Sequence, residues 1–501
     1  MKECRVRGSV TIYFVLMMCV LVSLIMTSII SVKVSAGRMQ AANGADQALY
    51  SLFARYDRQL MEEYGLFFLN AGSGGSDADI GSCIALIEDS MDYILHPNKG
   101  LALLGGKNLL QLERTGSAVT AYTLATDAGG IPFEAQAVQA VKETAAADGM
   151  AFLQEKLTER QKVEQEGKAL MENSSADQYG AVEAASEEAK KEREEAAEEA
   201  AARGEVLPEE ESVEVPEGFI NPLPALYRLY RKKVMDIVVP DKERISGRSV
   251  DKNSLVSKRQ LSTGLGIIDA TGAAGGTDNL FYMAWVIGHF GSYAHPKEES
   301  CLAYQMEYLL KGKYKDKDNL SAVIGDLMKV RQAANMLCLY TDPEKSPELS
   351  MLALFIGTVM FIPEAEPVIK AILAALWAYA ESLVDVRALL SGYKVAIRKD
   401  RTTWQTDVED LAASGGNIEN LPRDCAGGIS YEEYLATFIM VMQRRTLTPR
   451  AMDMVESYVR GSGRPDFRLD ACISALSVRI SIRSEGRVTF PVERSIAYLE
   501  M

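Results

Sequence analysis

Residues 9–32 form an uninterrupted stretch of 24 residues without a formally charged side chain. As an α-helix this stretch would be about 36 Å long at ~1.5 Å per residue, and the hydrocarbon core of a bilayer is ~30 Å thick. Thirteen of the residues are Val, Ile, Leu or Phe, and each favours insertion by roughly 0.3–0.6 kcal/mol. The sequence therefore predicts a single membrane-spanning helix over residues 9–32.

The charges on either side of this stretch predict its orientation. Residues 1–8 carry three basic side chains, and residues 33–38 carry two. Because basic flanks stay on the cytoplasmic side, we expect a short cytoplasmic amino terminus over 1–8 and an extracytoplasmic location for the rest of the chain. A cleaved secretory signal ending at 34–36 is the alternative, but its apolar core would be longer than the usual ~7–15 residues.

The helical spacing of apolar residues continues beyond the predicted span. It predicts that one amphipathic helix runs without a break through residues 33–70, as far as a Gly- and Ser-rich joint at 71–78. The apolar positions are Ala45, Leu49, Leu52, Phe53, Tyr56, Leu60, Tyr64 and Phe67.

Two segments far apart in the chain have the alternation of strands. The first segment, residues 107–127, lies within a small α+β region at 71–150. Its alternation predicts a hairpin of short strands around Gly116. In the carboxyl-terminal region 462–501, apolar residues alternate with polar ones over 476–483, and a turn at 484–486 leads into a second strand. Because an isolated hairpin is marginally stable in water, we expect both segments to join in one sheet near the membrane-proximal helix.

Between these segments the pattern is mostly helical. Residues 151–218 are a charged acidic helix and linker, and 219–297 are mixed and loop-rich. Residues 298–461 predict a bundle inserted between the parts of a helix-and-sheet unit, so that the fold class is α+β and mostly α. The expected bundle helices are Glu298–Lys311, Asn319–Tyr340, Pro347–Ile362, Glu364–Leu390, Ser430–Met442 and Thr448–Val459.

Composition excludes several classes of function. The formal charge of −15 argues against nucleic-acid binding, which needs a basic face. The three histidines have no metal-ligand spacing, and the cysteines have no Cys-x-x-Cys pair, so we expect no metal, no small-molecule cofactor and buried free thiols. Residues 105–108 and 264–269 only partly match a phosphate loop and a dinucleotide fingerprint.

One pair of acidic residues deserves comparison with catalytic carboxylates. Glu381 and Asp385 are four residues apart and would share a helical face beside Trp377. Two carboxylates at such a site can divide acid and base roles, as in glycosidases. Inward carboxylates on an apolar helix more often belong to structural ion pairs, here for example with Arg331 or Arg398. We expect no catalysis.

Several short runs carry a resemblance to a known family. At the amino terminus they are 8–14, 48–57 and 63–67, and later in the chain they are 377–390, 430–435 and 465–470. With these runs the chain resembles the TadE/TadG-like proteins of tight-adherence pilus systems. It looks still more similar to a large extracytoplasmic family of unknown function from anaerobic Gram-positive bacteria.

The resemblance implies a function and a possible processing site. Pilin-like proteins carry a glycine before their apolar helix, after which a peptidase can cut, and Gly8 followed by Ser9 fills that place. The glutamate expected at the fifth position after the cut is Tyr13, which favours an anchored minor pseudopilin over a polymerising subunit. The implied partners are the membrane and pilus or secretion assembly proteins, contacted through the amino-terminal helix.

Two other functions remain open from the sequence. The first is a membrane-anchored cell-wall hydrolase that uses Glu381 and Asp385. The second is a surface adhesin or binding module that uses the acidic segment 151–218.

Overall fold

The protein is seen here in a computed structural model of the full chain. The structure describes residues 7–72, 78–95, 110–142, 147–172, 176–203, 214–266, 276–414, 417–418, 421–484 and 488–499. The expected joint at 71–78, the partial phosphate loop at 105–108, the linker at 204–218 and the Gly-rich segment at 264–276 lie wholly or partly outside these residues.

The chain divides into two compact units, and both are discontinuous in sequence. Unit 1 contains residues 1–144, 256–285 and 455–501, and unit 2 contains 145–255 and 286–454. The helices α9 (Gly276–His289) and α16 (Arg444–Gly461) each contribute residues to both units. The ranges 151–218, 219–297 and 298–461 from the sequence all contribute to unit 2.

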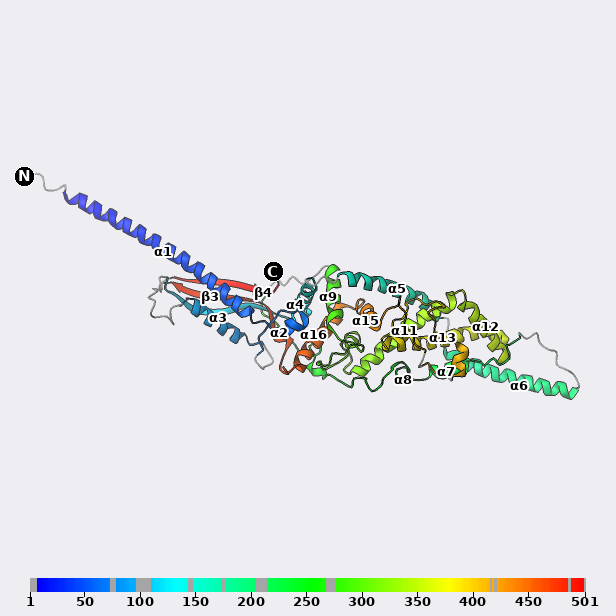
Figure 1. The fold of residues 1–501 in the computed structure, drawn as a ribbon. Coiled ribbons are helices and arrows are strands. Elements are labelled where there is room, and N and C mark those ends of the chain that lie inside the picture. Colours follow the sequence, from blue (N-terminus) through cyan, green and yellow to red (C-terminus); the bar gives the residue numbers. More distant parts are fainter. Residues whose placement is uncertain are drawn as a thin grey trace, which may run out of the picture. The chain divides into compact units, whose positions relative to one another are not determined.

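Unit 1 begins with a helix of 47 residues, α1 (Arg7–Phe53) (Figure 1). It is followed by α2 (Arg58–Tyr64), β1 (Leu69–Asn70), α3 (Ile80–Leu95), β2 (Leu112–Leu124) and α4 (Ile131–Lys142). The unit closes with β3 (Cys472–Ser484) and β4 (Val488–Ala497). This arrangement confirms the expected α+β class, with the carboxyl-terminal strands in a small antiparallel sheet.

The sheet of unit 1 is built around β3. Antiparallel pairing joins β3 to β2 from Leu112↔Ser484 to Leu124↔Ile473, and to β4 from Ala475↔Ala497 to Ser484↔Val488. The short β1 pairs with the start of β3. The expected union of the two strand regions in one sheet is therefore confirmed.

One face of this sheet forms the core of unit 1. Because side chains alternate along a strand, the even-numbered residues Leu476, Val478, Ile480 and Ile482 are buried, while Arg479 and Arg483 on the other face are exposed. The buried face packs with apolar residues of α1 and α3, including Ala45, Leu49, Ile87 and Met91. The sheet therefore packs against the part of α1 that follows the predicted span, as expected.

The helix continues without a break from the apolar stretch, as predicted, but only as far as Phe53, so the predicted extension to residue 70 is too long. Helix α1 ends at Phe53, and the chain turns before it enters α2. Asp57 is the N-cap of α2, where its side chain accepts a hydrogen bond from the Leu60 backbone N–H at 3.2 Å. This cap supplies an acceptor at the start of a new helix, so a seven-residue helix follows in place of a continuation.

The predicted hairpin around Gly116 is also wrong. β2 is one strand of 13 residues, and its pairing shifts register between Arg114 and Gly116. One extra residue on β2 is accommodated there as a β-bulge, which a glycine inside a strand often marks. The strand continues past the bulge because β3 offers thirteen residues of pairing partner.

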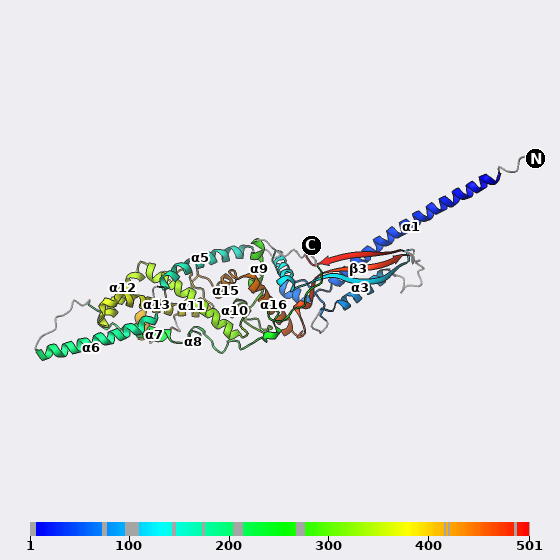
Figure 2. The same cartoon turned by 180° about the vertical axis from the view of Figure 1, so that it is seen from behind.

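Unit 2 is helical. Its central helices α11 (Asp316–Thr341) and α13 (Glu366–Leu390) run side by side beneath α5 (Ala147–Met171) (Figure 2). The expected first bundle helix is shorter than predicted, because 298–304 precede α10 in turns. The remaining helices are α6 (Tyr179–Arg203), α7 (Leu223–Tyr230), α8 (Val234–Val238), α10 (Gln305–Lys311), α12 (Lys345–Val359), α14 (Val408–Ala413) and α15 (Tyr431–Ile439).

Candidate functional site

The outer part of α1, residues 10–32, is apolar around its whole circumference, and all of these residues are exposed. Tyr13 is 69% exposed, Val20 67% and Val32 68%. This segment is long and apolar enough to cross a membrane. Exposure of an apolar helix to water on all sides would be strongly unfavourable. Its small hydroxyls are satisfied within the helix, where Thr27 Oγ1 donates to the Ser23 carbonyl at 2.8 Å and Ser28 Oγ to the Leu24 carbonyl at 2.9 Å.

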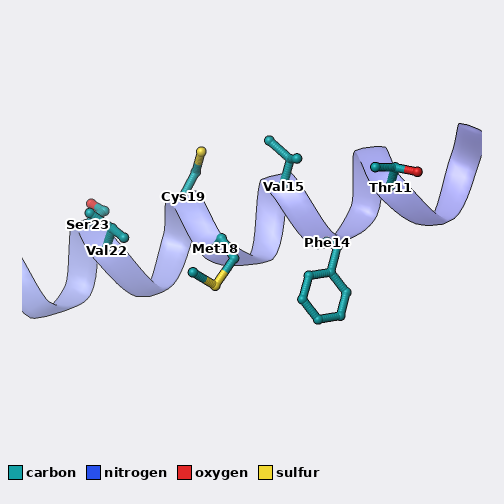
Figure 3. A pocket seen from close by; sticks show the side chains of 7 residues that line it. All are labelled: Thr11, Phe14, Val15, Met18, Cys19, Val22 and Ser23. Atoms are coloured by element: carbon teal, nitrogen blue, oxygen red, sulfur yellow. The ribbon is translucent and has the colours of Figure 1, made fainter.

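A shallow apolar hollow runs along this part of α1, and all of its lining comes from the one helix (Figure 3). Because neighbouring turns of a single helix cannot enclose a ligand, the hollow is the groove that a second packed helix would fill. The lining side chains are Thr11, Phe14, Val15, Met18, Cys19, Val22 and Ser23. The possible processing residues Gly8 and Ser9 fall in the first turn of α1, one turn before the hollow.

The inner part of α1, residues 37–53, contributes to the core of unit 1. Gly37 is buried there, and a Cβ at this position would lie 3.1 Å from Leu112 Cδ2 of β2. A small residue on an apolar helix can allow the close approach of a second helix. The structure uses Gly37 instead for close packing of α1 on its own sheet.

A second helix, Pro363–Leu390, also passes the length and composition criteria for a membrane span. Unlike α1, this helix is mostly buried, and it carries Glu381 and Asp385 on its inner face. It is the core helix of unit 2.

Three of the residues that carry the family resemblance make close contacts within unit 1. Asp57, whose side chain is 3% exposed, pairs with Arg464 at 2.7 Å. Gly65 has a φ of 66°, and a Cβ there would lie 2.9 Å from Ala140 Cβ. Asp470 is completely buried and accepts hydrogen bonds from Arg259 at 2.7 Å and from Arg468 at 2.6 Å. These residues hold together segments of unit 1 that are distant in sequence.

Glu381 and Asp385 lie at the centre of unit 2, both completely buried. Arg331 Nε of α11 donates to Asp385 Oδ2 at 3.0 Å, and Lys399 Nζ lies 2.5 Å from Asp385 Oδ1. Lys399 also pairs with Glu381. The expected pair of Asp385 with Arg331 is present, whereas the second cation is Lys399 and not its neighbour Arg398.

Glu381 and Arg331 make further hydrogen bonds with the surrounding chain. Glu381 accepts from the backbone N–H groups of Gln405 at 3.0 Å and Thr406 at 2.8 Å. Arg331 Nη1 donates to the Ala396 carbonyl at 2.8 Å and to the Tyr434 hydroxyl at 2.9 Å. The four charges therefore fasten the loop after α13 onto α11 and α13.

The electrostatics of this cluster differ from those of an acid–base pair. Burial raises the pKa of the Asp385 carboxyl, but Arg331 and Lys399 outweigh it and hold that pKa below its usual range. Burial lowers the pKa of Lys399, and Asp385 and Glu381 more than reverse this. Two acidic and two basic side chains are thus paired with each other, which is the arrangement of a buried salt-bridge network.

One buried carboxyl was not singled out from the sequence. Glu307 of α10 is completely buried, and its Oε1 accepts from the Tyr293 backbone N–H at 2.8 Å and from the Tyr431 hydroxyl at 2.7 Å. Burial is the main cause that raises the pKa of Glu307 to about 7. No sequence motif marks this residue, because its environment is made by Tyr293 and Tyr431, which are distant along the chain.

Among the residues that the structure describes, no three His, Cys, Asp or Glu side chains are arranged so that they could hold a metal ion. His295 Nδ1 lies 2.8 Å from Glu432 Oε1, with no second histidine or thiol in the group. Cys83, Cys338 and Cys472 are free and buried, as we expected, whereas Cys301 and Cys425 are only half-buried. Burial raises the pKa of Cys83 to about 11 and that of Cys338 to about 12, so these thiols are protonated and unreactive at neutral pH.

No curated protein and no solved structure matches the chain. A family model, described as a family of unknown function (DUF5702), matches residues 210–484. This range covers more than half of the 501 residues, including most of unit 2 and strand β3. The chain belongs to the DUF5702 family of unknown function.

Proposed function

We propose that the protein is a membrane-anchored, extracytoplasmic accessory component of a tight-adherence pilus or a related type II-like secretion system. In this proposal it acts as a minor pseudopilin without catalytic activity. The outer part of α1 spans the membrane once, with the amino terminus in the cytoplasm, and contacts assembly proteins laterally. The two units lie on the extracytoplasmic side.

The observation that carries the proposal is the division of α1 into two parts with different surroundings. The outer part is exposed and apolar, while the inner part packs on an antiparallel sheet. A helix that is half exposed and half packed on a sheet is the architecture of pilin-like subunits, which the resemblance at residues 8–14, 48–57 and 63–67 implies. Tyr13 supports a minor role, because a phenol cannot form the ion pair of the usual glutamate.

The hydrolase alternative finds little support in the cluster around Glu381. An acid–base pair needs access to substrate and water, together with pKa values that differ between its two members. Both carboxylates are instead buried and neutralised by Arg331 and Lys399. Cell-wall digestion assays with the wild type and Glu381→Gln distinguish the two functions, and we expect no hydrolysis by either protein.

Co-purification from the native host tests the proposed partners. Ser23 and Thr27 are small residues on one face of α1, and Ser23→Phe/Thr27→Phe places two bulky side chains there. The control is Ile25→Phe/Ile29→Phe on the opposite face, about 200° away at ~100° per residue. Both variants keep the helix apolar. We expect secretion assembly proteins to co-purify with the wild type and the second variant, and to be lost from the first.

Two results would contradict the proposal. The first is that no secretion or pilus protein co-purifies with the wild type. The second is a gene neighbourhood that lacks both a secretion ATPase and a prepilin peptidase.

A further inference from the structure

A groove on unit 2 lies between α5, α11 and α15, which are adjacent in the bundle (Figure 1). Its apolar lining includes Val330 of α11, Phe438 of α15 and Val441, and Val441 is 52% exposed. Its polar rim carries Arg160 and Lys168 of α5 and Lys329 of α11. The groove thus combines an apolar floor with several cations.

Each carboxylate in the groove is shared by two cations. Glu164 Oε2 lies 3.1 Å from Arg160 Nη1, and its Oε1 lies 2.5 Å from Lys168 Nζ. Asp326 pairs with Lys311, and its Oδ1 lies 3.9 Å from Lys329 Nζ. Four cations therefore face two carboxylates, which leaves a local excess of positive charge in a chain with a formal charge of −15.

Arg160 is buried and has one side-chain donor without a hydrogen-bond partner in the described part of the chain. Its side chain is 5% exposed, and its guanidinium carbon lies 4.7 Å from the centre of the Phe438 ring. Burial is the main cause that lowers the pKa of Arg160, and its Nε finds no acceptor among the described residues. A buried donor without a partner is unfavourable, so a further acceptor or anion in the groove would stabilise it.

The same chain contains a segment with the complementary chemistry. Residues 204–217 hold six glutamates and no lysine or arginine, interleaved with Val206, Leu207, Val213 and Val215. The helix before this segment, α6, projects beyond α12 (Figures 1 and 2). Its last buried residue is Ser186, so Arg203 lies about 25 Å further along the helix at ~1.5 Å per residue. The described part of the chain therefore ends, at Arg203, well away from the buried part of α6.

We propose that the groove of one copy of this chain binds the acidic segment 204–217 of a second copy. Glutamates of the segment pair with Arg160, Lys168 and Lys329, and its valines and leucine pack on Phe438 and Val441. Because groove and segment are different surfaces, the contact is head-to-tail and can extend over several copies. This inference goes beyond the proposed pilus role and does not depend on it.

Self-association of the full chain in detergent micelles tests this proposal by analytical ultracentrifugation at low ionic strength. We expect the wild type to self-associate, and Lys168→Glu/Lys329→Glu to weaken association roughly tenfold or more, since two exposed pairs are reversed. Glu209→Lys/Glu210→Lys/Glu211→Lys should have the same effect, and both sets combined in one chain should restore association. Lys162→Glu/Lys317→Glu is the control, because it makes the same change in net charge at exposed lysines outside the groove.

Direct binding uses a fluorescent peptide of residues 204–217, with inorganic pyrophosphate as a competing probe. We expect the peptide to bind the wild type and not Lys168→Glu/Lys329→Glu. A wild type that stays monomeric and does not bind the peptide would overturn the proposal. Pyrophosphate binding without peptide binding would overturn it as well, in favour of a phosphate-containing polymer.

Discussion

At the scale of single residues, two buried carboxyls of unit 2 lie in opposite surroundings. Asp385 is held between Arg331 and Lys399, which keep its pKa low. Glu307 accepts hydrogen bonds from neutral groups only, and burial raises its pKa to about 7. The two residues should therefore respond differently to substitution and to pH.

Replacement of Asp385 by Asn should strongly destabilise unit 2. It leaves two buried cations, Arg331 and Lys399, with a single carboxylate, and a broken buried pair costs about 3–5 kcal/mol. Urea denaturation of the full chain in detergent would measure the change. The control is Asp410→Asn at an exposed position, where we expect a change within about 0.5 kcal/mol. Equal effects of the two substitutions would contradict a neutral buried network.

Glu307 predicts a pH dependence with a definite sign. Its pKa is raised from 4.5 in the unfolded chain to about 7 in the folded protein, so the folded state favours the protonated form. Its contribution to stability is complete below pH 4.5 and is lost as the pH rises to about 7. For one group this amounts to about 3 kcal/mol, at ~1.4 kcal/mol per pKa unit.

Glu307→Gln isolates this term, because glutamine does not titrate. The free energy of unfolding of the wild type, relative to that of the variant, should fall as the pH rises from about 4.5 to 7. Above that range the difference between the two proteins should stay constant. The groups that face Glu307, namely Tyr431, Tyr293 and Asp316, remain in both proteins. A difference that does not change with pH would contradict the raised pKa of Glu307 in the folded state.

At the scale of elements, long periodic segments were predictable and their interruptions were not. The α13 helix was predicted within two residues, because its apolar period and its end at Leu390 are clear in the sequence. The break after Phe53 was missed because Leu60 and Tyr64 continue the spacing that precedes it, and only the capping role of Asp57 reveals a new helix. Gly116 suggested a turn, but a long partner strand turned the same glycine into a bulge.

The candidate site was predictable to a similar extent. Glu381 and Asp385 stood out as charges on an apolar helix, and the pairing with Arg331 follows from the need to neutralise them. The sequence could not distinguish Lys399 from Arg398 as the second cation, because both lie in the loop after α13. The path of this loop is set by tertiary hydrogen bonds, which the backbone N–H groups of Gln405 and Thr406 donate to Glu381.

Contact between α5 and α11 gives a test of helix packing with an internal control. A Cβ at Gly167 of α5 would lie 2.0 Å from the Ala333 carbonyl oxygen, so Gly167→Ala must push the two helices apart. At Gly325 of α11 a Cβ would meet nothing within 4 Å. We expect Gly167→Ala to destabilise unit 2 by about 1–3 kcal/mol and Gly325→Ala to stabilise it by about 0.5–1 kcal/mol. Thermal denaturation of both variants would show whether the signs differ.

At the scale of the whole molecule, each unit is assembled from separate stretches of sequence. Unit 1 needs residues 1–144, 256–285 and 455–501, and its sheet pairs β2 with a strand almost 350 residues later, Leu124 lying opposite Ile473. Local alternation of apolar and polar residues predicted the strands. Their pairing in one sheet was predicted because an isolated hairpin is only marginally stable in water. The exact segments that return to unit 1 depend on tertiary contacts, such as the pairs of Arg259 with Glu456 and Asp470.

The central claim is that the outer part of α1 lies in the membrane while both units face outward. Protease treatment of intact cells, followed by alkaline carbonate extraction, tests this claim directly. We predict that the untreated chain stays in the carbonate-insoluble pellet and that external protease shortens it to a small membrane-bound fragment. Recovery of the intact chain in the soluble fraction, or its full protection from external protease, would contradict the account.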